Sequence, residues 1–231
     1  NSHVKEVLID KNKNIKGVLC IDQNNLEYTF RSKKVILAAH TINNPAILLR
    51  SAKNYFPEGL ANSSGQLGRN LMDHVKYYMM GKIDEKVYSH KLGFETSASS
   101  HFHDHTSRNR YGASRILVRE TSGPTPNDIA MSSGFWGNKL EEEIKKTFNH
   151  SLVLGCLSEQ LPYQDNRVEL SSTIKNEFGQ PAVKVSYKLM RKYEQDAYRN
   201  MIKILKSIYH EIPSKEVQII MPPSNCGHLM G

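Results

Sequence analysis

The sequence predicts a mixed α/β and α+β fold, in which a short parallel-sheet unit is joined to an antiparallel sheet with helices on one face. Two observations lead to this prediction. A continuously apolar run at 35–39 passes without a loop into a helical pattern over 42–49. Further along, two runs of alternating apolar and polar residues flank a turn within 168–187, and helical apolar spacing continues over 193–210. The second pattern is typical of a hairpin with one buried face and a long helix that covers it.

The strand-to-helix unit begins with the apolar residues Val35 to Ala39, which suit a strand buried on both faces of a parallel sheet. The helix that follows would carry Ile42, Ala46 and Leu49 on one face, with Pro45 in its first turn, where a missing N–H costs little. Ligands bind such sheets where a strand ends and its helix begins, because the helix N-terminus offers N–H groups to anions. Many such junctions pack without a ligand, so this one alone does not establish a cofactor site.

The first thirty residues predict a small antiparallel meander. Val4 to Ile9, Ile15 to Ile21 and Leu26 to Phe30 read as strands, and the segments between them are rich in Asp and Asn. In the middle of the chain we expect the following elements. They are a strand at 75–83, a linker at 123–127 whose prolines exclude a helix, a strand at 129–135, an amphipathic helix at 139–148 and a strand at 151–157.

The formal net charge of +8 does not predict a nucleic-acid partner. The lysines are scattered, and the densest charge run, Lys139 to Lys146, is balanced by three consecutive glutamates, as on an ordinary solvated helix face. No basic groove with interleaved aromatic residues is visible. The mean hydropathy of −0.53 and the lack of any run near 20 apolar residues exclude a membrane-spanning segment in this chain.

The three cysteines, Cys20, Cys156 and Cys226, are far apart and contain no C-x-x-C pair, so we expect buried thiols in a reducing, cytoplasmic compartment. Three histidines alternate in the sequence HFHDH at 101–105 and would share one face of a strand. Alternating imidazoles can bind zinc or copper, but no carboxylate or cysteine is placed to complete the set. We therefore expect a solvated hairpin tip and no metal site.

Two long motifs and a third segment of the sequence resemble a known family. The sequence VILAAHTINNPAILLRS at 35–51 is followed by PEGLANSSGQLGRNLMDH at 57–74, and SEQLPYQDNRVEL occurs at 158–170. The first two resemble the glucose-methanol-choline (GMC) oxidoreductases, including choline dehydrogenase-like members, in which AAG-x-I-x-x-P-x-LLL-S precedes G-x-L-G-x-NL-x-DH. In the family a glutamate, a proline and an N-R-V-x-L strand occur together, as in the third segment.

The resemblance implies an internal fragment of an FAD-dependent enzyme with three parts. Residues 1–74 would form a partial FAD-binding, Rossmann-like domain, 75–220 the substrate-binding domain, and 221–231 a segment that returns to the FAD domain. The strand–G-x-G-x-x-G–helix unit that opens such flavoproteins is not found in this sequence. The family's catalytic histidine would lie beyond residue 231, so no catalytic residue is expected in this chain.

Cofactor contacts are implied by the resemblance at five positions. Val4 would lie beside the adenine end of FAD, Ala38, Ala39 and His40 would lie on the cofactor side of the fold, and His228 would return near the isoalloxazine. At His40 the sequence departs from the family, which has glycine after the two alanines. Glycine allows close approach of backbone to a ligand, so the imidazole either points away from the flavin or contacts it.

Substrate contacts are expected from Glu159 and Gln160, which directly follow a buried strand. Carboxylate and amide groups accept hydrogen bonds from the hydroxyl groups of sugars or polyols. Glu159 could equally pair with Arg167 and fix the loop. Adjacent Asp73 and His74 would point to opposite faces of an extended segment, so we interpret them as structural.

By resemblance, the parent protein would oxidise a CH–OH group of an alcohol, sugar or polyol, with FAD accepting the hydride. The isolated chain would be inactive and would bind FAD weakly or not at all, because it lacks the remaining parts of the parent. A non-catalytic binding module that shares the substrate-domain fold is the alternative. The substrate, the electron acceptor and the oligomeric state are not encoded in these patterns.

Overall fold

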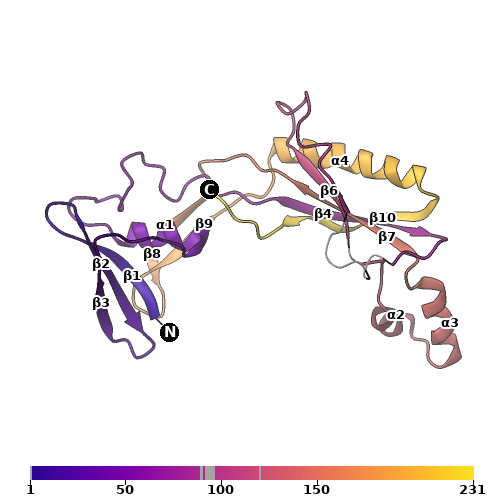
Figure 1. Ribbon diagram of the computed structural model, residues 1–231, viewed down its shortest axis with the longest axis horizontal. Helices are drawn as coiled ribbons and strands as arrows, with labels where there is room; N and C mark the ends of the chain where they lie inside the picture. The colour runs from indigo at the N-terminus through magenta and orange to yellow at the C-terminus, as the bar shows by residue number, and fades with distance from the viewer. Residues whose placement is uncertain (1, 89–90, 92–96, 120) are drawn as a thin grey trace. The chain divides into compact units, whose positions relative to one another are not determined.

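The computed structural model describes residues 2–88, 91, 97–119 and 121–231 (Figure 1). The chain divides into two compact units. The first unit comprises Asn1–Met72, Pro162–Lys188 and Leu229–Gly231, and the second comprises Asp73–Leu161 and Leu189–His228. In the described part of the chain, no helix has the length and apolar character required to cross a membrane.

The first unit begins with the predicted meander. Strands β1 (Ser2–Ile9), β2 (Ile15–Asp22) and β3 (Glu27–Arg31) pair antiparallel in the order β1-β2-β3. The aspartates at the two turns fix them: Asp10 Oδ1 accepts the N–H groups of Asn12 and Asn14, each at 2.9 Å, and Asp22 does the same one turn later. The meander is confirmed.

The predicted strand at Val35–Ala39 does not form. These residues have no strand assignment, and Ile36 is 91% exposed. A strand exists only as part of a ladder, and no described segment pairs with this one, so an apolar run suited to a sheet interior lies extended and unpaired. The Rossmann-like part of the predicted fold is therefore not seen.

Helix α1 (His40–Arg50) is confirmed, with Ala46 and Ile47 buried against β1 and the hairpin strand β8. The prediction for Pro45 was wrong, because the helix begins at His40 and the proline lies inside it. Its missing N–H therefore leaves a gap in the ladder of helical hydrogen bonds.

The hairpin of β8 (Arg167–Lys175) and β9 (Pro181–Ser186) is also confirmed, but it belongs to the first unit. This differs from the predicted division, which placed residues 75–220 in one domain. The long helix α4 (Lys192–Glu211) was predicted to cover this hairpin. That prediction was wrong, because α4 belongs to the second unit.

The second unit is a five-stranded antiparallel sheet in the order β10-β4-β7-β6-β5, with α4 along one face (Figure 1). Its strands are β10 (Ser214–Asn225), β4 (Val75–Ile83), β7 (Ser151–Ser158), β6 (Ser114–Val118) and β5 (Ser97–Ser99). The core joins the inward-facing residues of β4 and β7 to the apolar side of α4, including Tyr77, Met79, Cys156, Leu205 and Tyr209. An antiparallel sheet with a covering helix is thus confirmed.

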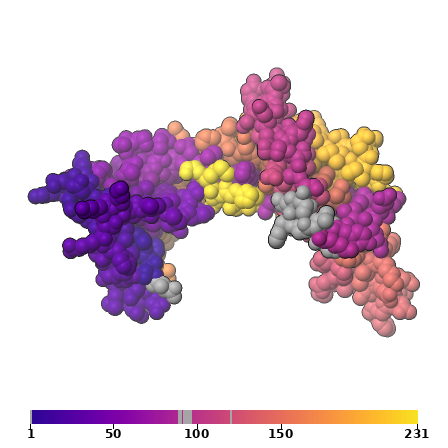
Figure 2. All heavy atoms as spheres, viewed as in Figure 1, coloured from indigo at the N-terminus to yellow at the C-terminus, as the bar shows by residue number. Residues whose placement is uncertain are grey.

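Two short helices protrude from the rest of the second unit (Figures 1 and 2). Helix α3 (Asn138–Thr147) was predicted, but α2 (Pro126–Ser133) replaces the strand predicted at 129–135. The reason is a capping box: the Thr125 side chain accepts from the Asp128 N–H while Asp128 accepts from the Thr125 N–H. Pro126 occupies the first helical turn, where proline is favourable, so the prolines did not exclude a helix.

The histidine-rich segment at 101–105 forms turns, not the strand that would align its imidazoles. Within the described residues, no three His, Cys, Asp or Glu side chains are grouped to hold a metal ion. All three cysteines carry free thiols; Cys20 and Cys156 are buried and Cys226 is half-buried.

Two glycines of the segment SGQLGRNLMDH provide a matched test of backbone constraint. Gly65 and Gly68 have φ values of 67° and 77°, in the left-handed region. A Cβ on Gly65 would meet nothing within 4 Å, whereas one on Gly68 would lie 2.3 Å from the carbonyl oxygen of Val168. We expect Gly65→Ala to lower the free energy of unfolding of the first unit by about 1–2 kcal/mol. Gly68→Ala should cost about 1–3 kcal/mol more because the backbone must move.

Urea unfolding followed by circular dichroism measures both variants. Equal losses for Gly65→Ala and Gly68→Ala would contradict the close approach of Gly68 to β8.

Candidate functional site

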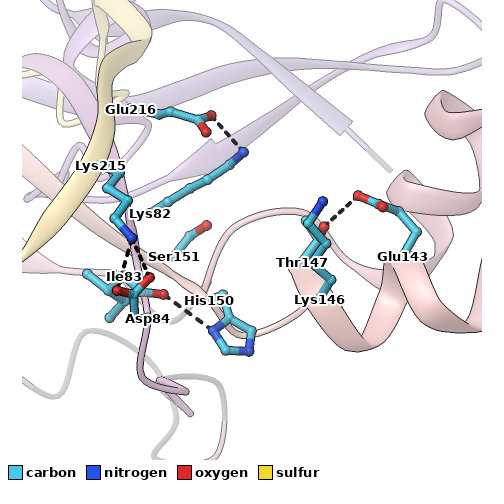
Figure 3. Close-up of a pocket in the computed structure, with 10 residues that line it drawn as sticks. All are labelled: Lys82, Ile83, Asp84, Glu143, Lys146, Thr147, His150, Ser151, Lys215 and Glu216. Carbon is cyan, nitrogen blue, oxygen red and sulfur yellow. Dashed lines mark hydrogen bonds and ion pairs between the residues drawn. The ribbon is translucent and has the colours of Figure 1, made fainter.

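Two pockets formed by described residues of the second unit are similar in size. One, with a volume of about 440 Å³, has mixed charges that compensate one another (Figure 3). Lys82 pairs with Glu216 at 2.6 Å, and Lys215 contacts both carboxylate oxygens of Asp84 at 3.0 Å. Because these four charges are already paired, this pocket offers little to an external ligand.

The other pocket has a volume of about 420 Å³ and gathers several functional groups. Its lining includes His74, His103, Arg108, Arg115, Glu159 and His228. The groups come from the start of β4, the turn region before β6, β6 itself, the end of β7 and the segment after β10. We take it as the candidate site because it contains the predicted residue Glu159.

Glu159 is half-buried directly after β7, and both its carboxylate oxygens have partners. Oε2 accepts from Arg108 Nη2 at 2.7 Å, and Oε1 accepts from the Tyr193 hydroxyl at 2.7 Å. Burial raises the pKa of the carboxyl, but hydrogen bonds from Tyr193, the backbone near Ala113 and Arg108 together bring it below its usual value. Burial and the neighbouring carboxylate raise the pKa of Tyr193 to about 12. Glu159 is therefore charged and Tyr193 neutral at pH 7.

The suggested pairing of Glu159 with Arg167 is not observed. Arg167 lies in the first unit and pairs with Glu169 on the same strand at 2.8 Å. Glu159 thus takes a different arginine, Arg108, within its own unit.

Gln160 is buried, and its amide is engaged at both ends. Its Oε1 accepts from the backbone N–H of Asp73 at 3.1 Å, and its Nε2 donates to the carbonyl of Leu189 at 2.6 Å. The side chain holds backbone segments together, which differs from the substrate contact expected of it.

The Asp73 carboxylate binds backbone N–H groups of the two segments that carry His74 and His228. The carboxylate is only 1% exposed, and it accepts three backbone N–H groups: Oδ1 from His74 at 2.7 Å and His228 at 2.9 Å, and Oδ2 from Gly227 at 2.9 Å. The structural role expected for Asp73 is therefore seen.

The two histidine rings meet inside the pocket. His74 Nδ1 lies 3.1 Å from His228 Nδ1, with the rings at 88° to each other. The Cys226 sulfur lies 3.5 Å from the same His228 nitrogen. Burial lowers the pKa of His74 and the nearby His228 lowers it further, against the opposing effects of Asp73 and Glu159.

Comparison with known proteins finds a family model and several relatives that match this chain. Residues 1–76 match the family model described as GMC oxidoreductase. The fructose dehydrogenase large subunit of Gluconobacter japonicus is 30% identical over 188 residues, which cover 81% of this chain and 35% of that protein. Residues 1–76 of the chain thus match the GMC oxidoreductase family.

Other relatives of this chain are also named as oxidoreductases. The 2-methyl-1,2-propanediol dehydrogenase of Mycolicibacterium austroafricanum is 27% identical over 79% of this chain and 34% of that protein. The 6'''-hydroxyparomomycin C oxidase of Streptomyces lividus is 29% identical over 77% of this chain and 30% of that protein. The chain thus spans about a third of the length of these relatives.

A solved structure also matches the chain. Formate oxidase of Aspergillus oryzae has a TM-score of 0.46 and 15% identity, over 80% of this chain and 39% of that one.

The residues predicted to contact the cofactor lie in the first unit, except His228. Val4 is half-buried on β1, and Ala38 and Ala39 precede α1. His40 has a φ of 77°, which glycine adopts without strain, and glycine is the residue of the commonest family pattern at this position. Helix α1 has no side-chain cap and no acidic residue in its first turn, so its N-terminus suits an anion. Among these features, the N-terminus of α1 fits a phosphate group.

Three residues of the site were missed in the sequence. Arg108 is a loop residue 51 positions before Glu159, and no periodic pattern points to it. Tyr193 was interpreted as the start of an apolar helix face, although its hydroxyl faces the carboxylate. Gly112 leaves room for both side chains, since a Cβ there would lie 2.5 Å from Glu159 Cγ and 3.0 Å from the Tyr193 ring. The sequence alone gives no sign of this close approach.

Proposed function

We propose that this chain supplies the substrate-binding sheet and part of the flavin-binding domain of an FAD-dependent GMC oxidoreductase. The enzyme would oxidise a CH–OH group of an alcohol, sugar or polyol. The observation that carries the proposal is the 30% identity to a fructose dehydrogenase subunit over 188 residues, a match long enough to extend beyond either unit. The names of the other relatives, which specify a propanediol and a hydroxyparomomycin, support a hydroxylated substrate.

FAD would supply the acceptor for the hydride that leaves the substrate carbon. In this chain, Val4, Ala38, Ala39 and His40 would contact the cofactor in the first unit, and His228 would do so from the second. The uncapped N-terminus of α1 supports this assignment, because its backbone N–H groups favour phosphate.

Substrate would bind in the pocket that contains Glu159. The carboxylate is charged, half-buried and held by Arg108 and Tyr193, so it is oriented to accept hydrogen bonds from hydroxyl groups. Arg108, which is exposed, adds donors beside it. A carboxylate next to a guanidinium suits a ligand with several neighbouring hydroxyl groups, since each hydroxyl can both donate and accept.

The full-length gene product, loaded with FAD, tests the proposal. We expect D-fructose or another polyol to bleach the oxidised flavin absorbance under anaerobic conditions, and to reduce an added dye in steady state. A flavin spectrum that no alcohol, sugar or polyol changes would overturn the proposed activity.

The isolated chain of 231 residues should bind FAD weakly. The physical reason is that Val35–Ala39 has no neighbouring strand among the described residues, and the sequence contains no G-x-G-x-x-G loop to hold the pyrophosphate. Titration of FAD fluorescence measures this, and we expect the signal of free FAD throughout. The full-length gene product serves as the control and should quench it. Stoichiometric quenching by the isolated chain would show that these residues suffice.

A further inference from the structure

We propose that Asp73 is a positioning residue of the pocket, whose carboxylate keeps His74 and His228 in contact so that the two imidazoles bind a single proton between them. The inference rests on the proposed function only for the kind of ligand that the pocket takes. The contact itself is a property of the chain.

The carboxylate of Asp73 joins two segments that are far apart in the sequence. It is 1% exposed and accepts the N–H of His74 at the start of β4 and those of Gly227 and His228 after β10. Only an ionised carboxylate offers two acceptor oxygens for these N–H groups. In an asparagine at this position, the NH₂ group would face one of these backbone N–H groups, and that N–H group would have no acceptor.

The distance between the rings requires a shared hydrogen. A separation of 3.1 Å between His74 Nδ1 and His228 Nδ1 is a hydrogen-bond distance. Each neutral imidazole has one donor and one acceptor nitrogen, so one Nδ1 carries the hydrogen and the other accepts it. One added proton leaves this N–H···N bond intact. A second would place two N–H groups against each other and separate the rings.

The surroundings of the pair oppose a second proton. The titratable and charged groups near the pair are Asp73, His103, Arg108, Arg115, Glu159 and Cys226. Burial, and after it His228, lower the pKa of His74, and the carboxylates of Asp73 and Glu159 oppose this shift only in part. Arg108 and Arg115 add positive charge to the same pocket, which further disfavours a doubly protonated pair.

A singly protonated pair gives the pocket a donor opposite Glu159. The ring nitrogens not used in the contact can donate to an oxygen atom of a bound hydroxyl compound, while Glu159 accepts from its hydroxyl groups. Asp73 does not itself bind the hydroxyl compound, because its oxygens accept backbone N–H groups, and its charge also raises the pKa of His74.

A titration of the histidine Hε1 signals by NMR, on the 231-residue chain without ligand, tests the proposal between about pH 4 and pH 9, around the usual imidazole pKa of about 6.5. We expect His74 and His228 to titrate in two coupled steps separated by more than about one pH unit. In Asp73→Asn the two rings should titrate independently of each other. The control Asp84→Asn removes a carboxylate from the surface pair with Lys215 and should leave the coupled titration unchanged.

A second variant keeps the test decisive if Asp73→Asn does not fold. In His228→Gln, His74 should titrate in one step. The midpoint of this step should lie at a higher pH than the step in which the unmodified pair takes up its second proton. Independent titration in the unmodified chain, or coupled titration in Asp73→Asn, would overturn the proposal. These outcomes do not depend on flavin reduction by a polyol, so failure of the proton-sharing pair and failure of the proposed oxidoreductase activity are distinguishable.

Discussion

Tyr209→Ala should lower the free energy of unfolding of the second unit by about 3–5 kcal/mol, the range for removing a large buried aromatic side chain. Tyr209 is 2% exposed on α4 and packs into the core against the sheet. Its hydroxyl also lies between strands: the oxygen is 2.8 Å from the Met79 carbonyl and 3.0 Å from that of Leu152, and it accepts the Leu154 N–H at 3.2 Å. The substitution removes both the ring and this link between α4, β4 and β7.

Urea unfolding of the isolated chain, followed by circular dichroism, measures the loss. Tyr209→Phe retains the ring and should cost about 1–2 kcal/mol, since the Leu154 N–H loses a side-chain partner. Phe30→Ala, at a 59% exposed position on β3, serves as the surface control and should stay within about 0.5 kcal/mol. A loss below about 1 kcal/mol for Tyr209→Ala would mean that α4 does not hold the sheet through this residue.

The sequence predicted elements whose cause is local. The meander follows from β-branched runs between Asn- and Asp-rich turns, and β4 from the strand-like run Val75–Ile83, where Tyr77 and Met79 are fully buried. The strand at Val35–Ala39 failed because apolar character indicates burial, whereas a strand also needs a neighbour. Periodicity likewise showed that α4 buries one face, but not that the sheet of β4 and β7 covers it instead of the hairpin.

Helix α2 was predictable, and its signal was misinterpreted. The sequence Thr125-Pro126-Asn127-Asp128 contains a capping box with proline in the first turn, which favours a helix. The prediction of a linker gave weight only to the prolines. The site was only partly predictable for a different reason. Glu159 follows a strand and was identified, but Arg108 and the His74–His228 contact depend on how distant segments are brought together.

Glu159→Ala is expected to reduce kcat/KM of the full-length gene product for its polyol substrate by about 10- to 150-fold. This corresponds to about 1.5–3 kcal/mol, the contribution of hydrogen bonds to a charged group. The carboxylate would no longer accept from substrate hydroxyl groups, and Arg108 and Tyr193 would lose the group that orients them. Anaerobic flavin reduction at several substrate concentrations separates binding from the chemical step.

A structural role for Glu159 predicts a different pattern, so two further variants decide between the roles. Glu159→Gln keeps the shape but not the charge, and should lie between the wild type and Glu159→Ala, because its amide still offers one acceptor oxygen. Tyr193→Phe removes only the hydroxyl that donates to Oε1, and should cost less than Glu159→Ala if the carboxylate itself contacts substrate. If Tyr193→Phe and Glu159→Ala lowered kcat/KM equally, and also lowered the free energy of unfolding equally, Glu159 would serve only to attach the loop of Arg108 to α4. A larger loss of kcat/KM in Glu159→Ala at similar stability is the result expected of a residue that binds substrate.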